Sequence, residues 1–226
     1  MLLKKLLAIA AGLAAATLAA GTAAAQMPLV APPPPPITAE NSWHLDLSTG
    51  GRVTIQLRPD VAPNHVERIR TLTRMGFYNG LVFHRVLEGF MAQGGDPTGT
   101  GLGQSELPDL APEFNPLPHL RGTVAMARSE DPGSANSQFY IVLTPSFALD
   151  RRYTVFGRVV AGMGYVDLIE RGEPPANPSR IIRASIGSDN VPPMTADELR
   201  AAAAAAAQRP PAAAAPTIAP PPRQPQ

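Results

Sequence analysis

Alternating hydrophobic and polar residues predict two neighbouring strands near the start of the folded part of the chain. Residues 43–47 alternate, and the apolar residues at every second position of 52–57 share one face. Gly50 and Gly51 stand between the two runs, where a tight turn needs residues that tolerate unusual backbone angles. The pattern therefore predicts a β-hairpin.

A longer hydrophobic period follows and predicts a helix over residues 63–75. Asn64 and Glu67 have the spacing of a capping pair at its start. The apolar residues recur at helical spacing and would face the core as one stripe, formed by Val66, Ile69 and Leu72.

The most unusual pattern covers residues 81–87 and 90–93, two short apolar runs separated by Glu88 and Gly89. Read as strands, they place Arg85 on one face with apolar neighbours, and Met91 with Gln93 on one face of the next run. A guanidinium, an amide, a thioether and a phenyl ring thus gather in a few residues. This mixture suits an apolar pocket with a polar rim better than a uniform core.

Further strands are predicted over residues 122–128, 138–143, 155–160 and 181–186, with a helix over 163–170. Many strands with only two helices indicate a mainly β fold, a closed antiparallel barrel capped by the helices. Residues 96–103 have the spacing G-x-G-x-G, and Pro108 follows where a phosphate-binding helix would begin. We therefore interpret this segment as a surface loop.

The two ends of the chain differ in composition from its middle. Residues 1–25 combine Lys4 and Lys5 with an apolar run and the small residues Ala23, Ala24 and Ala25, which is typical of a cleaved signal peptide. We expect export to a bacterial periplasm, and the alternative is an uncleaved anchor helix. The absence of cysteine excludes a lipid anchor after the leader.

Residues 26–40 predict a proline-rich linker without a packing role, or alternatively a ligand for a proline-reading module. The folded domain would span residues 41–190. In residues 191–226, Thr195 and Glu198 form a capping box before an alanine helix to about 208, and the Pro/Ala-rich remainder is expected to be disordered. Deleting both tails should leave stability and activity nearly unchanged.

Composition excludes several classes of function. The 226 residues contain 19 basic and 18 acidic side chains, a net charge of +1, which gives no footprint for nucleic acid. Without cysteine there are no disulfides and no thiolate chemistry, and without lysine beyond the leader there is no P-loop or Schiff base. His44, His65 and His119 lack metal-ligand spacing, so no metal or other cofactor is predicted.

Three ordered motifs carry a resemblance to a known family. They are FHRVLEGFMAQGGD at residues 83–96, GTVAMAR at 122–128 followed by NSQFYI at 136–141, and LDRRYTVFG at 149–157. Together they closely resemble the cyclophilin family of peptidyl-prolyl isomerases over residues 43–186. The resemblance implies a closed eight-stranded antiparallel β-barrel capped by two α-helices, and isomerase activity on X-Pro peptide bonds.

The resemblance also implies the residues of the site. Arg85 and Gln93 would be the catalytic pair. The residues that would hold the proline ring are Phe90, Met91, Tyr140 and Leu149, and those along the substrate groove are Ala127, Arg128, Gln138 and Tyr153. The alternation along residues 138–143 independently separates Tyr140, assigned to the site, from Phe139, assigned to the core.

Three positions depart from the family pattern. Tyr140 stands where many relatives have Phe, Tyr153 where they have His, and Ala148 where well-known eukaryotic members have Trp. The loss of Trp should weaken cyclosporin binding more than catalysis.

Rotation about a peptide bond needs no nucleophile and no proton transfer. It needs a site that favours the twisted amide, and Arg85 suits this because its guanidinium is always charged and carries several donors. His84 falls on the opposite face, where a structural role is favoured over a general base. The expected partners are unfolded or partly folded polypeptides that contain proline, and the protein is expected to be a monomer. The rival hypothesis is a proline-segment binding module or chaperone with incidental turnover.

Overall fold

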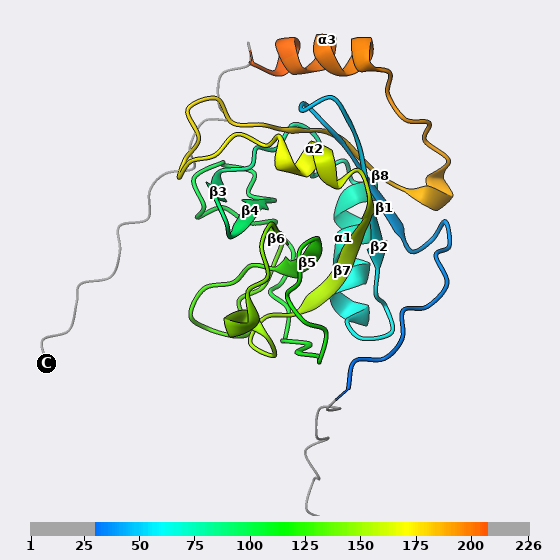
Figure 1. Ribbon diagram of the computed structural model, residues 1–226, viewed down its shortest axis with the longest axis vertical. Coiled ribbons are helices and arrows are strands. Elements are labelled where there is room, and N and C mark those ends of the chain that lie inside the picture. The colour runs from blue at the N-terminus through cyan, green and yellow to red at the C-terminus, as the bar shows by residue number, and fades with distance from the viewer. Residues whose placement is uncertain (1–29, 208–226) are drawn as a thin grey trace, which may run out of the picture.

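The protein is described by a computed structural model in which residues 30–207 are placed (Figure 1). Eight strands form one antiparallel sheet in the order β3-β4-β6-β5-β7-β2-β1-β8. Their bounds are β1 Ser42–Leu47, β2 Gly51–Leu57, β3 Arg85–Leu87, β4 Met91–Gly94, β5 Thr123–Met126, β6 Phe139–Val142, β7 Val155–Ala161 and β8 Ile181–Ile186. The helices are α1 Pro63–Arg74, α2 Met163–Asp167 and α3 Ala196–Ala207, with short 3-10 turns at η1 Phe147–Leu149 and η2 Gly187–Asp189.

The sheet curls, but its end strands β3 and β8 do not form a ladder with each other, so the predicted closure of the barrel is not found. They meet only before β3, where Val82 bridges Arg180 and the Phe83 N–H donates to Ser179 O at 2.9 Å. In Figure 1 the strands β3 and β4 accordingly lie across from β1, β2 and β8.

The strand predicted over residues 81–87 is shorter than expected because its partner ends early. Arg85 pairs with Gln93, so His84 would lie opposite Gly94, the last residue of β4, and Phe83 would need a partner beyond it. Gly95 has φ +86°, and a Cβ there would lie 2.4 Å from Ser137 O. Only glycine can make this turn, and it directs the chain away from β3.

The predicted hairpin and helix are confirmed. β1 and β2 pair with Leu45 opposite Val53, and Gly50 makes the turn with φ +109°. The apolar stripe of α1 is fully buried, and each such side chain contributes about 1.5–3 kcal/mol of burial free energy. It packs into a core that also contains the edge-to-face aromatic side chains Trp43, Tyr78 and Phe139.

The predicted capping pair of α1 is wrong. The N-cap residue Ala62 makes no side-chain cap bond. Instead Glu113, from a distant loop, accepts hydrogen bonds from the backbone N–H groups of Asn64 at 3.1 Å and His65 at 3.0 Å. A carboxylate satisfies free helix donors and suits the positive end of the helix dipole, so a tertiary contact replaces the local cap.

The proline-rich segment has a packing role, contrary to expectation. The Gln56 side-chain amide donates to Pro35 O at 2.6 Å, and Arg58 Nη2 donates to Pro32 O at 3.1 Å. An extended polyproline segment leaves its carbonyl oxygens without internal partners, so they are available to donors in β2 and just after it.

The segment after β8 also contacts the sheet. Thr195 and Glu198 form the predicted capping box, with the Thr195 N–H donating to Glu198 Oε2 at 2.7 Å. Leu199 of α3 is buried, and Arg52 and Arg183 donate to Pro192 O. The predicted signal peptide, the first residues of the linker and the predicted disordered end fall in residues 1–29 and 208–226, outside the described residues.

Candidate active site

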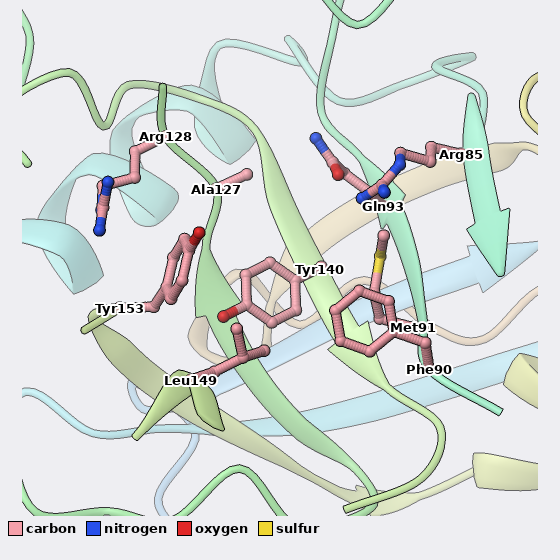
Figure 2. Close-up of a pocket in the computed structure, with 9 residues that line it drawn as sticks. All are labelled: Arg85, Phe90, Met91, Gln93, Ala127, Arg128, Tyr140, Leu149 and Tyr153. Atoms are coloured by element: carbon pink, nitrogen blue, oxygen red, sulfur yellow. The ribbon is translucent and has the colours of Figure 1, made fainter. Parts of the chain in front are cut away.

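One pocket of about 120 Å³ gathers most of the predicted site residues. It lies on the face of β4, β5 and β6 opposite the main core. Its lining residues, all drawn in Figure 2, are Arg85, Phe90, Met91, Gln93, Ala127, Arg128, Tyr140, Leu149 and Tyr153. The remaining predicted residue, Gln138, lines an adjoining pocket together with Gln93, Ala127 and Arg128. Their roles in binding and turnover stay predictions.

The floor of the pocket is apolar because the strands alternate. Along β6, Phe139 and Ile141 enter the main core, whereas Tyr140 packs with Met91 in a second, smaller apolar cluster. Phe90 and Leu149 are half-buried beside this cluster, and Figure 2 shows the Phe90, Tyr140 and Leu149 side chains around the same hollow. A small apolar ring can dock on such a surface without leaving polar groups unpaired.

The polar rim is formed by Arg85 and Gln93, which are directly opposite across β3 and β4. Opposite residues of antiparallel strands share a face, and Figure 2 shows the two side chains side by side. Gln93 Nε2 donates to Gln138 Oε1 at 2.9 Å. Gln138 Nε2 in turn donates to Gly101 O at 3.0 Å and Gly103 O at 2.8 Å, so the glycine-rich loop holds the rim in place.

Among the described residues, the Arg85 side chain has one hydrogen-bond partner. Its Nε donates to Glu173 Oε1 at 2.5 Å, and its side chain remains 34% exposed. Within residues 30–207 its two terminal nitrogens have no hydrogen-bond partner, so their N–H groups are available to a ligand in the pocket.

A buried histidine that is not among the predicted site residues supports the floor. His119 Nδ1 lies 2.9 Å from Asp150 Oδ1, and His119 Nε2 lies 3.0 Å from the Tyr140 hydroxyl oxygen. Burial lowers the pKa of His119, against the opposing effect of Asp150, so the ring is neutral at neutral pH. Nδ1–H then donates to the carboxylate, and Nε2 accepts from the Tyr140 hydroxyl.

The signal for His119 was the departure at Tyr140 itself. A hydroxyl on a buried ring requires a hydrogen-bond partner, and Phe at this position would not. Burial also raises the pKa of Tyr140, so its hydroxyl stays protonated and donates.

The wall opposite the rim is formed by Arg128 and Tyr153. The Arg128 guanidinium carbon lies 4.5 Å from the centre of the Tyr153 ring, and its nitrogens donate to the carbonyl oxygens of Ser129 and Arg152. Tyr153 meets Tyr140 edge-on with ring centres 5.8 Å apart. These contacts fix the Arg128 side chain as part of the wall.

His84 does not line the pocket. It is 6% exposed, and neither ring nitrogen has a hydrogen-bond partner among the described residues. Burial lowers its pKa, so the ring is neutral. The described residues contain no cluster of three or more potential metal ligands, and none of their helices is long and apolar enough to cross a membrane.

Comparisons with known proteins agree with this geometry. A sequence model of the family described as "Cyclophilin type peptidyl-prolyl cis-trans isomerase/CLD" matches residues 44–186. A "Probable peptidyl-prolyl cis-trans isomerase" of Brucella suis is 46% identical over 166 residues, covering 66% of this chain and 84% of the relative. A "Peptidyl-prolyl cis-trans isomerase-like 1" of Neurospora crassa is 36% identical over 147 residues, covering 62% and 90%.

Solved structures give the same result. The cyclophilin AquaCyp293 from Hirschia baltica superposes with a TM-score of 0.64 at 30% identity, covering 69% of this chain and 77% of that one. A cyclophilin-type isomerase of Cryptosporidium parvum, crystallised in the presence of the dipeptide Ala-Pro, gives 0.60 at 26% identity, covering 64% and 98%. The chain therefore belongs to the family of cyclophilin-type peptidyl-prolyl cis-trans isomerases.

Proposed function

We propose that the pocket binds the proline ring of an X-Pro segment on its apolar floor, while Arg85 stabilises the twisted amide during rotation. One observation carries the proposal: the terminal nitrogens of Arg85, which have no hydrogen-bond partner within residues 30–207, border a pocket floored by Met91, Tyr140 and Leu149. Ring and amide are adjacent in an X-Pro segment, as the apolar floor and the guanidinium are in this site.

The energetics suit a single well-placed donor. The rotation barrier of about 18–20 kcal/mol arises from amide resonance, which is lost as the bond twists. The nitrogen then regains a lone pair that accepts a hydrogen bond. A hydrogen bond to a charged group contributes about 1.5–3 kcal/mol, and a thousandfold acceleration requires ~4 kcal/mol. Arg85 with the adjacent Gln93 amide is sufficient for an acceleration of this size.

No proton transfer enters this mechanism. His84 is outside the pocket, and His119 is separated from it by Tyr140, whose hydroxyl it binds. Because an arginine does not change its charge near neutral pH, turnover should be nearly independent of pH from about 6 to 9.

For substrates, we propose proline-containing segments of unfolded or partly folded polypeptides. The Cryptosporidium parvum relative crystallised with Ala-Pro supports this class of ligand. The leader over residues 1–25 supports export to a bacterial periplasm. We propose that the protein assists the folding of exported proteins there, and that it acts as a monomer. N-terminal sequencing should show that the exported protein begins at or near Gln26. An intact Met1 in a membrane fraction would refute export.

The experiment that separates an enzyme from a proline-binding module is isomer exchange on an Ala-Pro peptide. NMR exchange spectroscopy measures the cis-trans rate, and titration of the same peptide measures affinity. We expect catalytic amounts of protein to accelerate exchange well above the uncatalysed 10–100 s timescale. Affinity without acceleration would assign the pocket to binding alone.

A further inference from the structure

The segment that follows α2 forms a short extra edge beside β3. The Val86 N–H donates to Gly172 O at 2.8 Å, and the Gly172 N–H donates back to Val86 O at 2.9 Å. Gly172 has φ +143°, and a Cβ at this position would lie 2.6 Å from Pro175 Cα. The backbone of this segment is therefore fixed against the strand that carries Arg85.

Two ion pairs cross this edge in opposite directions. Arg171 Nε donates to Glu88 Oε2 at 2.6 Å, and Arg85 Nε donates to Glu173 Oε1 at 2.5 Å. Near the Gly172–Val86 pair, each of the two segments thus contributes one arginine and one glutamate, and each arginine pairs with the glutamate of the other segment. Both carboxylate side chains are more than half exposed, but of the two only Glu173 pairs with a residue of the pocket.

The atom that Glu173 contacts is informative. A carboxylate bound at Nε restrains the plane of the guanidinium, and among the described residues both terminal nitrogens are left without a partner. Those nitrogens border the pocket, beside Gln93 in Figure 2. A carboxylate bound to the terminal nitrogens would instead have competed with a substrate for the same donors.

We propose that Glu173 is a positioning residue for catalysis: it fixes the rotation of the Arg85 guanidinium so that its terminal N–H groups face the substrate amide. The inference rests on the proposed role of Arg85. An exposed ion pair adds little to stability, so Glu173 acts through orientation and its removal affects turnover more than folding.

The test compares Glu173→Ala, Glu173→Gln and the matched control Glu88→Gln. Each is made in the wild-type protein and again in the Arg85→Ala variant. Glu173→Ala should lower kcat/KM about five- to tenfold, mainly through kcat. Glu173→Gln retains an acceptor for Nε and should recover part of this loss. Glu88→Gln breaks the neighbouring ion pair of the same segment without touching Arg85, and should stay within about twofold of wild type.

The Arg85→Ala background decides whether Glu173 acts through Arg85. There, Glu173→Ala should cause no further loss, with unchanged circular dichroism as the folding control. An equal loss in Glu88→Gln, a further loss without Arg85, or no effect of Glu173→Ala while Arg85→Ala is impaired would each refute the positioning role. Increased turnover in Glu173→Ala would also refute it, because the carboxylate would then restrain Arg85. Full activity of Arg85→Ala alone would instead overturn the proposed function.

Discussion

The hydroxyl group of Tyr140 makes the floor of the pocket depend on a histidine that does not line it. His119 is fully buried, and both of its ring nitrogens are satisfied, by Asp150 on one side and Tyr140 on the other. A buried polar group that loses its partner keeps its desolvation cost, so each member of this chain depends on the others.

Tyr140→Phe should therefore lower the free energy of unfolding by about 1–3 kcal/mol, because His119 Nε2 loses its donor. The aromatic ring remains, so turnover of a folded variant should change only a few-fold. Urea unfolding measures the change in the free energy of unfolding, and peptide exchange measures the change in turnover. Tyr153→Phe is the matched control: it lines the same pocket, and its hydroxyl has no hydrogen-bond partner within residues 30–207. Equal stability losses in the two variants would contradict the account.

At the scale of the elements, the departures from expectation share one cause. The cap of α1 comes from Glu113, the partner of Arg85 is Glu173, and the support of Tyr140 is His119. Each is a contact between segments far apart in the chain, made by residues whose local sequence is ordinary. The hairpin, the stripe of α1 and the capping box of α3 depend on near neighbours, and these were predictable.

The proline-rich segment gives the second prediction. Because Gln56 and Arg58 are each 6% exposed and donate to carbonyl oxygens of residues 32–35, a chain that begins at Ile37 leaves these donors without their partners. Its melting temperature should fall by about 3–6 °C, corresponding to about 1–2 kcal/mol. The control begins at Pro32 and keeps the segment. Calorimetry of the two chains decides, and identical melting temperatures would restore the spacer interpretation.

At the scale of the whole molecule, the motif residues gather around one pocket, whereas the sheet does not close as predicted. Motif residues that face the pocket do so because strand alternation fixes their side, as for Met91 and Tyr140. Closure of the barrel depends instead on whether the end strands β3 and β8 form a ladder with each other, and they do not. The hydrophobic pattern of each strand carries no information on whether two strands far apart in the chain meet.

Buried histidines should make stability, unlike turnover, depend on pH. Burial lowers the pKa values of His65, His84 and His119 in the folded protein. The unfolded chain therefore binds protons more tightly, so stability is complete above pH ~6.5 and falls as the pH drops below it. Each histidine that stays neutral contributes a slope of about 1.4 kcal/mol per pH unit.

Denaturant unfolding between pH 5 and 8 measures this slope, and His84→Phe, which removes one titrating ring, should make it shallower. Equal stability at pH 5 and pH 7 would contradict this prediction, because it would show that these rings take up protons as readily in the folded protein as in the unfolded chain.

The most direct test of the central claim is peptide exchange for wild type, Arg85→Ala and Arg85→Lys. Arg85→Ala should lower kcat/KM by about thirty- to a thousandfold, equivalent to about 2–4 kcal/mol, without unfolding the protein. Arg85→Lys keeps the charge but loses the planar fork, and should recover only part of that loss. Arg121→Ala, which removes an exposed arginine paired with Asp167 outside the pocket, should match wild type. Full activity in folded Arg85→Ala would contradict the account.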